Sequence, residues 1–198
     1  MRLILASGSP RRREYFERMG YEFEVVRPGT EERVRGGETA RDYVGRNAAE
    51  KAAEVARRAG PGAVVVSADT VVVRGEEILE KPKDAADARR MLRDLSGATH
   101  QVMTGLCIRE GGDGGKEVRT VVTTDVEFKE LGEEEIEAYI ASGEPMDKAG
   151  AYAIQGLAAY MIRAIRGSYT HVVGLPLAET ADILAGTFGV RPRMRDRG

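Results

Sequence analysis

LILASGSPRRR, residues 3–13, is the stretch around which the rest of the chain is organised. Its apolar run Leu3–Ala6 predicts a buried strand, and the small residues after it predict a tight turn. Ser9 is a favourable N-cap and Pro10 suits the first helical position, so we predict a helix from Pro10 to about Met19. A strand, a Gly/Ser turn and a helix N-terminus in this order are typical of a phosphate-binding loop.

Three arginines, Arg11, Arg12 and Arg13, lie in the first turn of this predicted helix. The helix dipole is positive at that end, so each cation costs roughly 0.3–1 kcal/mol unless an anion binds there. Three successive violations of this preference indicate a phosphate site formed by the arginines and the turn Ser7–Ser9. The alternative is a solvated basic turn without a ligand.

The composition restricts the classes of function. A length of 198 residues fits one large domain or two closely joined lobes. The net charge of −2 does not support general electrostatic binding to nucleic acid or membrane, and no apolar run approaches the ~20 residues of a membrane helix. A single cysteine, Cys107, excludes an intrachain disulfide and suits a reducing cytosol. We therefore expect a cytoplasmic protein that binds neither nucleic acid nor membrane.

Hydrophobic periodicity and turn residues predict further strands and helices along the chain. We expect strands at 21–27, 63–73, 78–79, 100–109, 118–128 and 157–165. We expect helices at 39–59, 84–95, 133–142 and 176–185. The last residues, 191–198, are expected to form a basic tail.

One acidic residue interrupts the most hydrophobic of these strands. Ala63–Val73, AVVVSADTVVV, is typical of a strand covered on both faces, and Asp69 lies inside it. A buried carboxylate is costly unless it is paired, hydrogen-bonded or bound to metal. We interpret Asp69 as a general base or metal ligand at a strand end; the alternative is a cap of a turn between two strands.

Two other pairs of polar residues lie between the phosphate-loop motif and this strand. Glu31 and Glu32 are expected to belong to an exposed acidic loop, with a metal-binding or catalytic role as the alternative. Asn47 and Lys51 lie four residues apart on one face of a predicted helix. Such a pair is usually solvated, and Lys51 becomes a candidate only if that face borders the phosphate loop.

The second half of the chain offers two more candidates. Lys81 precedes Pro82, which fixes the backbone and so directs the lysine side chain. Gln155 lies in the glycine-rich stretch Pro145–Gly156, PMDKAGAYAIQG. Its amide can both donate and accept a hydrogen bond, as reading the edge of a nucleobase requires. The alternative is a loop that stabilises its own backbone.

Six motifs together resemble the Maf family of nucleoside triphosphate pyrophosphatases. They are ASGSPRRRE at 6–14, SADTVV at 67–72, LEKP at 79–82, LSGATHQVMTG at 95–105, DKAGAYAIQG at 147–156 and GSYTHVVGLPL at 167–177. They cover nearly the whole chain in order. Ile154–Gly156 and Ser67–Val71 are similar to the branch of the family that acts on dTTP and UTP.

The resemblance implies an α/β fold with an elongated twisted mixed β-sheet flanked by helices. It further implies two lobes around a cleft, as in inosine triphosphate pyrophosphatases, with a single domain over residues 1–190. The implied reaction hydrolyses dTTP and UTP to the monophosphate and pyrophosphate with a divalent cation, Mg or Mn. A homodimer is also expected on this basis. Because the family has been associated with septum inhibition, the alternative is a non-catalytic nucleotide-sensing regulator of cell division.

The resemblance also assigns roles to individual residues. Asp69 is the implied proton acceptor, and the implied substrate-selecting residues are Arg11, Thr70 and Gln155. The triphosphate would be held by Ser7, Ser9, Arg12, Arg13, Lys51 and Lys81. A cation would be held by Asp69 with Glu31 or Glu32. Whether Asp69 binds the metal, accepts the proton or does both is left open by the sequence.

Overall fold

The computed structural model describes residues 1–112 and 114–193. The chain divides into two compact units. Unit 1 comprises Met1–Asp69, Thr104–Val122 and the C-terminal part from Gly174, and unit 2 comprises Thr70–Met103 and Thr123–Val173. Of the predicted tail, residues 194–198 lie outside the described residues, whereas the backbone N–H of Arg193 donates to the carbonyl of Gly20 at 2.9 Å.

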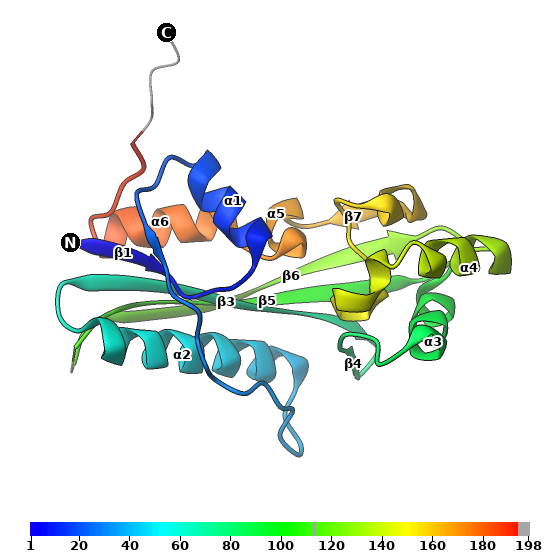
Figure 1. The fold of residues 1–198 in the computed structure, drawn as a ribbon, viewed down its shortest axis with the longest axis horizontal. Helices are drawn as coiled ribbons and strands as arrows, with labels where there is room; N and C mark the ends of the chain where they lie inside the picture. Colours follow the sequence, from blue (N-terminus) through cyan, green and yellow to red (C-terminus); the bar gives the residue numbers. More distant parts are fainter. Residues whose placement is uncertain (113, 194–198) are drawn as a thin grey trace, which may run out of the picture. The chain divides into compact units, whose positions relative to one another are not determined.

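Seven strands of the described chain form one sheet in the order β2-β1-β3-β5-β6-β7, with β4 paired to β3 off this path (Figure 1). The strands are β1 (Arg2–Leu5), β2 (Glu24–Val25), β3 (Ala63–Arg74), β4 (Glu77–Leu79), β5 (Thr99–Glu110), β6 (Glu117–Phe128) and β7 (Ile162–Arg166). Strand β1 is parallel to both β2 and β3, whereas β4 and β7 are antiparallel to β3 and β6. The sheet is therefore mixed, which confirms the expected α/β class.

Five of the described helices begin within one residue of their predicted starts. They are α1 (Pro10–Arg18), α2 (Ala40–Ala59), α3 (Ala85–Leu95), α4 (Glu133–Ala141), α5 (Tyr169–Val173) and α6 (Leu177–Thr187), with 3₁₀ turns η1 (Glu144–Asp147), η2 (Ala149–Ala151) and η3 (Leu157–Met161). Thr39 caps α2 by accepting a hydrogen bond from the N–H of Asp42 at 3.2 Å. Asp84 caps α3 in the same way, with the N–H of Asp87 at 2.8 Å.

In unit 1, α2 covers one face of the sheet and α1 and α6 cover the other (Figure 1). The contact of α2 with the sheet is made largely of small residues, and its buried cluster includes Ala48, Ala52 and Val65. Gly105 of β5 is required there, because a Cβ at this position would lie 2.2 Å from the carbonyl oxygen of Val44. The absence of a side chain at Gly105 lets the α2 backbone approach β5 closely.

Unit 2 has its own core, in which α3 and α4 pack against the strands. Phe128 and Tyr152 form an edge-to-face pair with ring centroids 4.8 Å apart, and His100 Nε2 lies 2.7 Å from the Tyr152 hydroxyl oxygen. These buried aromatic contacts tie the segment around Tyr152 to β5 and β6. They give His100 a structural role in the core of unit 2.

Two strand predictions were too long. The alternation over 21–27 predicts a strand, but only Glu24 and Val25 pair, because this edge strand has only the four-residue β1 as its partner. The predicted strand 157–165 begins as η3 and becomes β7 only at Ile162. The N–H of Leu157 donates to a side-chain carboxylate of Glu144 at 3.0 Å, so it is taken out of any strand ladder.

Two helix predictions also need correction. Helix α6 passes through Gly186 and ends at Thr187, although Gly186 was expected to stop it. A glycine inside a helix costs only about 1 kcal/mol relative to alanine, which tertiary packing overrides. The segment Tyr169–Val173, for which no helix or strand was predicted, forms the short helix α5.

Candidate active site

The predicted phosphate-binding loop joins β1 to α1, as the sequence indicates. Ser9 is the N-cap residue with extended backbone, φ −75° and ψ 120°, but its side chain makes no capping hydrogen bond. The expectation that its hydroxyl caps α1 is therefore wrong. Instead, the Ser9 N–H donates to the hydroxyl oxygen of Ser7 at 3.1 Å, which closes the loop on itself. Ser7 thus organises the turn.

Arg12 folds inward from the first turn of α1. Its Nε donates to the carbonyl oxygen of Gly174 at 2.7 Å, and its Nη1 donates to the Ser7 hydroxyl at 3.3 Å. Burial lowers the pKa of the Arg12 guanidinium from its ordinary value; the charge of Asp69 raises it and that of Arg11 lowers it. A half-buried cation that hydrogen-bonds both the Ser7 hydroxyl and the Gly174 carbonyl is at odds with a solvated basic turn.

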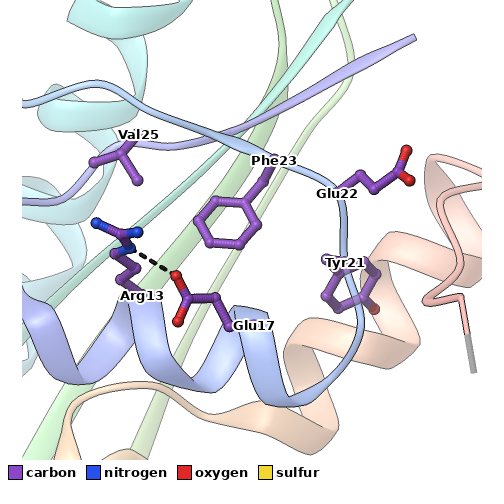
Figure 2. A pocket seen from close by; sticks show the side chains of 6 residues that line it. All are labelled: Arg13, Glu17, Tyr21, Glu22, Phe23 and Val25. Carbon is purple, nitrogen blue, oxygen red and sulfur yellow. Dashed lines mark hydrogen bonds and ion pairs between the residues drawn. The ribbon is translucent and has the colours of Figure 1, made fainter. Parts of the chain in front are cut away.

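Arg13 points away from this loop. Its Nε donates to Glu17 at 2.7 Å on the exposed side of α1, and 64% of its side chain is exposed. Figure 2 shows it at the rim of a surface cavity of about 500 Å³ lined by Arg13, Glu17, Tyr21, Glu22, Phe23 and Val25. Arg12 and Arg13 therefore have different surroundings, and the role predicted for Arg13 in triphosphate binding remains a prediction.

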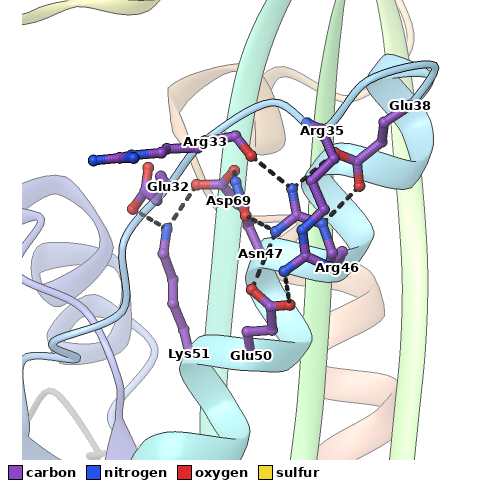
Figure 3. A network of polar contacts seen from close by, with 9 residues as sticks. All are labelled: Glu32, Arg33, Arg35, Glu38, Arg46, Asn47, Glu50, Lys51 and Asp69. Carbon is purple, nitrogen blue, oxygen red and sulfur yellow. Dashed lines mark hydrogen bonds and ion pairs between the residues drawn. The ribbon is translucent and has the colours of Figure 1, made fainter.

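Asp69 is buried in β3, on the face of the strand that meets α2. Its Oδ1 accepts a hydrogen bond from Lys51 Nζ at 2.7 Å and its Oδ2 accepts one from Asn47 Nδ2 at 2.9 Å (Figure 3). Because Asp69 lies within the strand, the turn-cap alternative is wrong. The expectation that Asn47 and Lys51 are solvated is also wrong, since the small residues of α2 bring both side chains into the interior.

Lys51 is shared between two carboxylates. Its Nζ lies 2.5 Å from Glu32 Oε1, and the exposed fraction of the side chain is 47% for Glu32 but only 8% for Asp69. The loop that carries Glu32 thus returns to α2 and reaches the partner of Asp69. Glu31 instead pairs with Arg33 at 2.6 Å and is 70% exposed, as expected for an acidic loop residue.

The donor set fits a hard divalent cation held jointly with a ligand. Mg²⁺ usually binds through one or two carboxylates together with phosphate oxygens and water, and Asp69 and Glu32 converge on the same ammonium group. No group of three or more His, Cys, Asp or Glu residues that could hold a metal ion is found among residues 1–112 and 114–193. A cation at this position would therefore depend on oxygens supplied by the substrate.

Asn47 is also held by a network of polar contacts that involves Arg46 and Glu38 (Figure 3). Arg46 Nη1 donates to Asn47 Oδ1 at 3.0 Å, and Arg46 binds Glu38 through two hydrogen bonds of 2.6 and 2.8 Å. The hydrogen bond to Glu38 is the main cause of the raised pKa of Arg46. Arg46 can only donate and the Asp69 carboxylate only accepts, so the orientation of the Asn47 amide is fixed by its two neighbours.

The sequence did not single out this network. Arg46 and Glu50 lie four residues apart on the predicted helix, but such pairs are common on helix surfaces and do not by themselves indicate a site. The link to Glu38, which precedes the helix, follows only from the fold. Of the predicted site residues, the structure brings Asp69, Lys51 and Glu32 together in unit 1.

Three predicted residues belong to unit 2. Thr70 follows Asp69 on β3 and is half-buried, and Lys81 and Gln155 are exposed. Pro82 is buried, as expected for a residue that fixes the backbone after Lys81. The substrate-binding roles of these three residues remain predictions.

The open mixed sheet with helices on its faces defines an α/β protein, and the Ser-rich turn before an arginine-rich helix is its candidate anion-binding site. Residues 2–187 match the family model described as Maf-like protein, so the chain belongs to the Maf family.

Several known proteins are similar over almost the whole chain. A dTTP/UTP pyrophosphatase of Anaeromyxobacter dehalogenans (strain 2CP-C) is 55% identical over 184 residues, covering 92% of both chains. A dTTP/UTP pyrophosphatase of Vibrio cholerae serotype O1 is 52% identical over 183 residues, covering 92% of this chain and 96% of the relative. One of Salmonella typhimurium (strain LT2) is 48% identical over 195 residues, covering 98% and 97%.

Among solved structures, a nucleoside-triphosphatase/dITP/XTP pyrophosphatase from Mycobacterium abscessus is similar to 65% of this chain and 73% of its own. The sequence identity is 18% and the TM-score is 0.38. The α/β assignment rests on the sheet order and strand directions described above. No helix among the described residues is long and apolar enough to cross a membrane.

Proposed function

We propose that this protein is a nucleoside triphosphate pyrophosphatase that hydrolyses dTTP and UTP to the monophosphate and pyrophosphate. The observation that carries the proposal is the Asp69 carboxylate, buried between Lys51 and Asn47 in a Maf-family chain. The names of relatives at 48–55% identity support the choice of substrates. A buried carboxylate requires compensation, and Lys51 and Asn47 provide it while leaving Asp69 as a carboxylate within the strand.

Asp69 is proposed to accept the proton of the attacking water. Each of its oxygens accepts one hydrogen bond from the protein and retains a lone pair that can face a water molecule. The ammonium group of Lys51 stabilises the charged carboxylate, which is the form that acts as a base. Water activated in this way would attack the α-phosphorus, and pyrophosphate would leave.

The negative charge that develops on the leaving pyrophosphate must be stabilised, so catalysis depends mainly on positioning and electrostatics. Arg12 is the best-placed cation for this purpose, because it is half-buried and held beside the Ser7–Ser9 turn by its hydrogen bond to Ser7. The predicted contributions of Ser9, Arg13, Lys51 and Lys81 to triphosphate binding are part of the same proposal.

A divalent cation, Mg or Mn, is proposed as the cofactor. Asp69 and Glu32 would hold it, while the exposed Glu31, paired with Arg33, is the weaker candidate. When bound, the cation would neutralise charge on the phosphate oxygens.

Selection of the pyrimidine is proposed to involve Arg11, Thr70 and Gln155. Uracil and thymine share an edge that presents carbonyl, N–H and carbonyl. A glutamine amide can donate to one carbonyl and accept from the ring N–H, which matches two of these three groups. A site that hydrogen-bonds its substrate discriminates strongly against analogues that leave its polar groups unpaired.

The remaining expectations complete the proposal. We place the protein in the cytoplasm, where its nucleotide substrates are found, as a homodimer whose chain forms one domain of two lobes over residues 1–190. A role in the housekeeping of modified nucleotides, and a link to septum inhibition, would follow from the same activity.

Pyrophosphate release from dTTP in the presence of Mg²⁺ tests the proposal directly. Asp69→Asn keeps the size of the side chain but removes the base, so this variant should bind dTTP and react about 10²–10⁴ times more slowly. Near-wild-type turnover of this variant would contradict the role of Asp69. If wild-type protein binds dTTP with Mg²⁺ and releases no pyrophosphate, the protein is instead a nucleotide sensor.

A further inference from the structure

The carboxylate of Glu144, at the start of η1, joins three segments of unit 2. Its Oε2 accepts a hydrogen bond from the backbone N–H of Leu157 at 3.0 Å. Its Oε1 accepts one from the hydroxyl of Tyr139, on α4, at 2.9 Å. The charged side chain therefore connects a core residue with the loop that carries Gln155.

The loop that carries Gln155 leaves space at Gly156 for the carboxylate of Glu144. A Cβ on Gly156 would lie 2.2 Å from Glu144 Oε1 and 2.5 Å from its Cδ, so any larger residue would displace one of the two. The φ of Gly156 is −101°, which other residues adopt readily. The glycine thus leaves the space that the carboxylate occupies, and the carboxylate lies directly against the residue after Gln155.

The Tyr139 end of this connection is rigid. Tyr139 is buried in the core of unit 2, and burial raises the pKa of its hydroxyl, with Glu144 adding to the effect. The phenol consequently stays protonated and serves as a donor over the whole physiological range. The loop is thereby tied to the core by a hydrogen-bonded carboxylate.

Gln155 itself is exposed and has a long, flexible side chain. Its backbone is held on both sides, because the N–H of Gly156 donates to the carbonyl of Ala153 at 3.0 Å and the N–H of Leu157 donates to Glu144. An amide can distinguish a carbonyl from an N–H group on a base edge only when its origin is fixed to within a fraction of an ångström.

From this geometry we infer that Glu144 is a positioning residue for Gln155 and thereby sets the selectivity for the pyrimidine base. The inference rests on the proposed function, in which Gln155 contacts the base. Glu144 acts through the backbone at positions 156 and 157 and is not itself expected to contact the substrate.

Three variants test this inference. Glu144→Ala removes both hydrogen bonds. Glu144→Gln can retain both, because its amide oxygen can accept from Leu157 while its NH₂ group donates to the Tyr139 oxygen. Glu137→Ala is the matched control, since Glu137 lies on α4 in the same unit and pairs with Arg89 at 2.8 Å on the exposed surface.

The measurement is kcat and KM for pyrophosphate release from dTTP, UTP, CTP and GTP. For Glu144→Ala we expect kcat/KM to fall about tenfold with dTTP and UTP and less than about twofold with CTP and GTP. Glu144→Gln should restore the pyrimidine preference to within about twofold of wild type, and Glu137→Ala should leave it unchanged. A purely structural role would lower all four rates by the same factor.

The outcomes separate this inference from the proposed function. If wild type prefers dTTP and UTP but Glu144→Ala lowers all four rates equally, or Glu144→Gln is as damaged as Glu144→Ala, the positioning role is wrong. If wild type releases pyrophosphate from none of the four, the proposed function fails and this inference fails with it. Should Glu144→Ala not fold, Tyr139→Phe removes only one of the two hydrogen bonds, and an unchanged substrate preference there would also overturn the inference.

Discussion

Replacing Lys51 with methionine tests whether the burial of Asp69 depends on a compensating charge. Lys51 Nζ lies 2.7 Å from Asp69, and the two side chains are only 7% and 8% exposed. Removing one partner of a buried ion pair costs about 3–5 kcal/mol, because the other charge is left without compensation. Glu32 is 47% exposed and can turn toward water, so the loss of a compensating charge affects mainly Asp69.

The double variant Lys51→Met/Asp69→Asn provides the internal check. Replacing both members of a buried pair with neutral groups of similar volume is often nearly neutral, so the double variant should be more stable than Lys51→Met alone. Asp69→Asn by itself should cost less than Lys51→Met, because Lys51 keeps Glu32 as a partner. The coupling between the two positions should be about 2–3 kcal/mol, near the upper end for residues in contact.

Urea unfolding at pH 7.5 measures these free energies, with an unchanged m value as the condition for comparison. Arg58→Met is the control, since Arg58 lies on the same helix and pairs with Glu54 at the surface at 3.0 Å. The Arg58→Met variant should lower the free energy of unfolding by no more than about 0.5 kcal/mol. The reasoning is refuted if Lys51→Met lies within about 1 kcal/mol of wild type, or if the double variant is less stable than Lys51→Met.

Two further predictions concern Arg12 and the buried histidine. Arg12→Ala should raise the KM for dTTP at least about tenfold, as expected for loss of a charge-assisted contact, whereas Arg13→Ala should change it by less than about threefold; equal effects would contradict the different surroundings of the two side chains. Burial lowers the pKa of His100 from 6.5 to about 4, so the unfolded state binds more protons between these values and stability should fall as pH decreases from 6.5 to 4. His100 should contribute about 3 kcal/mol to this loss, and His100→Gln should flatten the dependence in urea unfolding at pH 7 and pH 5.

The sequence predicted most of the helices and strands because the signals for them, hydrophobic periodicity and helix-terminal residues, lie within or next to the elements themselves. The caps Thr39 and Asp84 and the apolar run around Asp69 identified α2, α3 and β3 to within one or two residues. The errors occur where a partner distant in the sequence determines how long a strand is. The short β1 limits β2, and the carboxylate of Glu144 withdraws Leu157 from a strand ladder.

The candidate site shows the same difference between what local signals predict and what depends on residues distant in the sequence. Asp69 could be predicted because a carboxylate in an apolar strand is anomalous by itself. The burial of Asn47 and Lys51 could not be predicted, since their depth depends on how closely α2 approaches the sheet, which Gly105 of β5 permits.

The polar network around Asn47 also shows how an irregular loop can position Glu32, a candidate metal ligand. Arg46 Nη2 donates to the carbonyl oxygen of Arg33 at 3.0 Å, next to Glu32, while its Nη1 holds the Asn47 amide that binds Asp69. One guanidinium therefore fixes both the residue after Glu32 and the support of Asp69. Because Arg46 is in turn fixed by two hydrogen bonds to Glu38, a displacement of the loop must disturb the Asn47 amide as well. The positions of the two carboxylates that share Lys51 are thus linked through Arg46 and Asn47, although Glu32 and Asp69 lie 37 positions apart in the sequence.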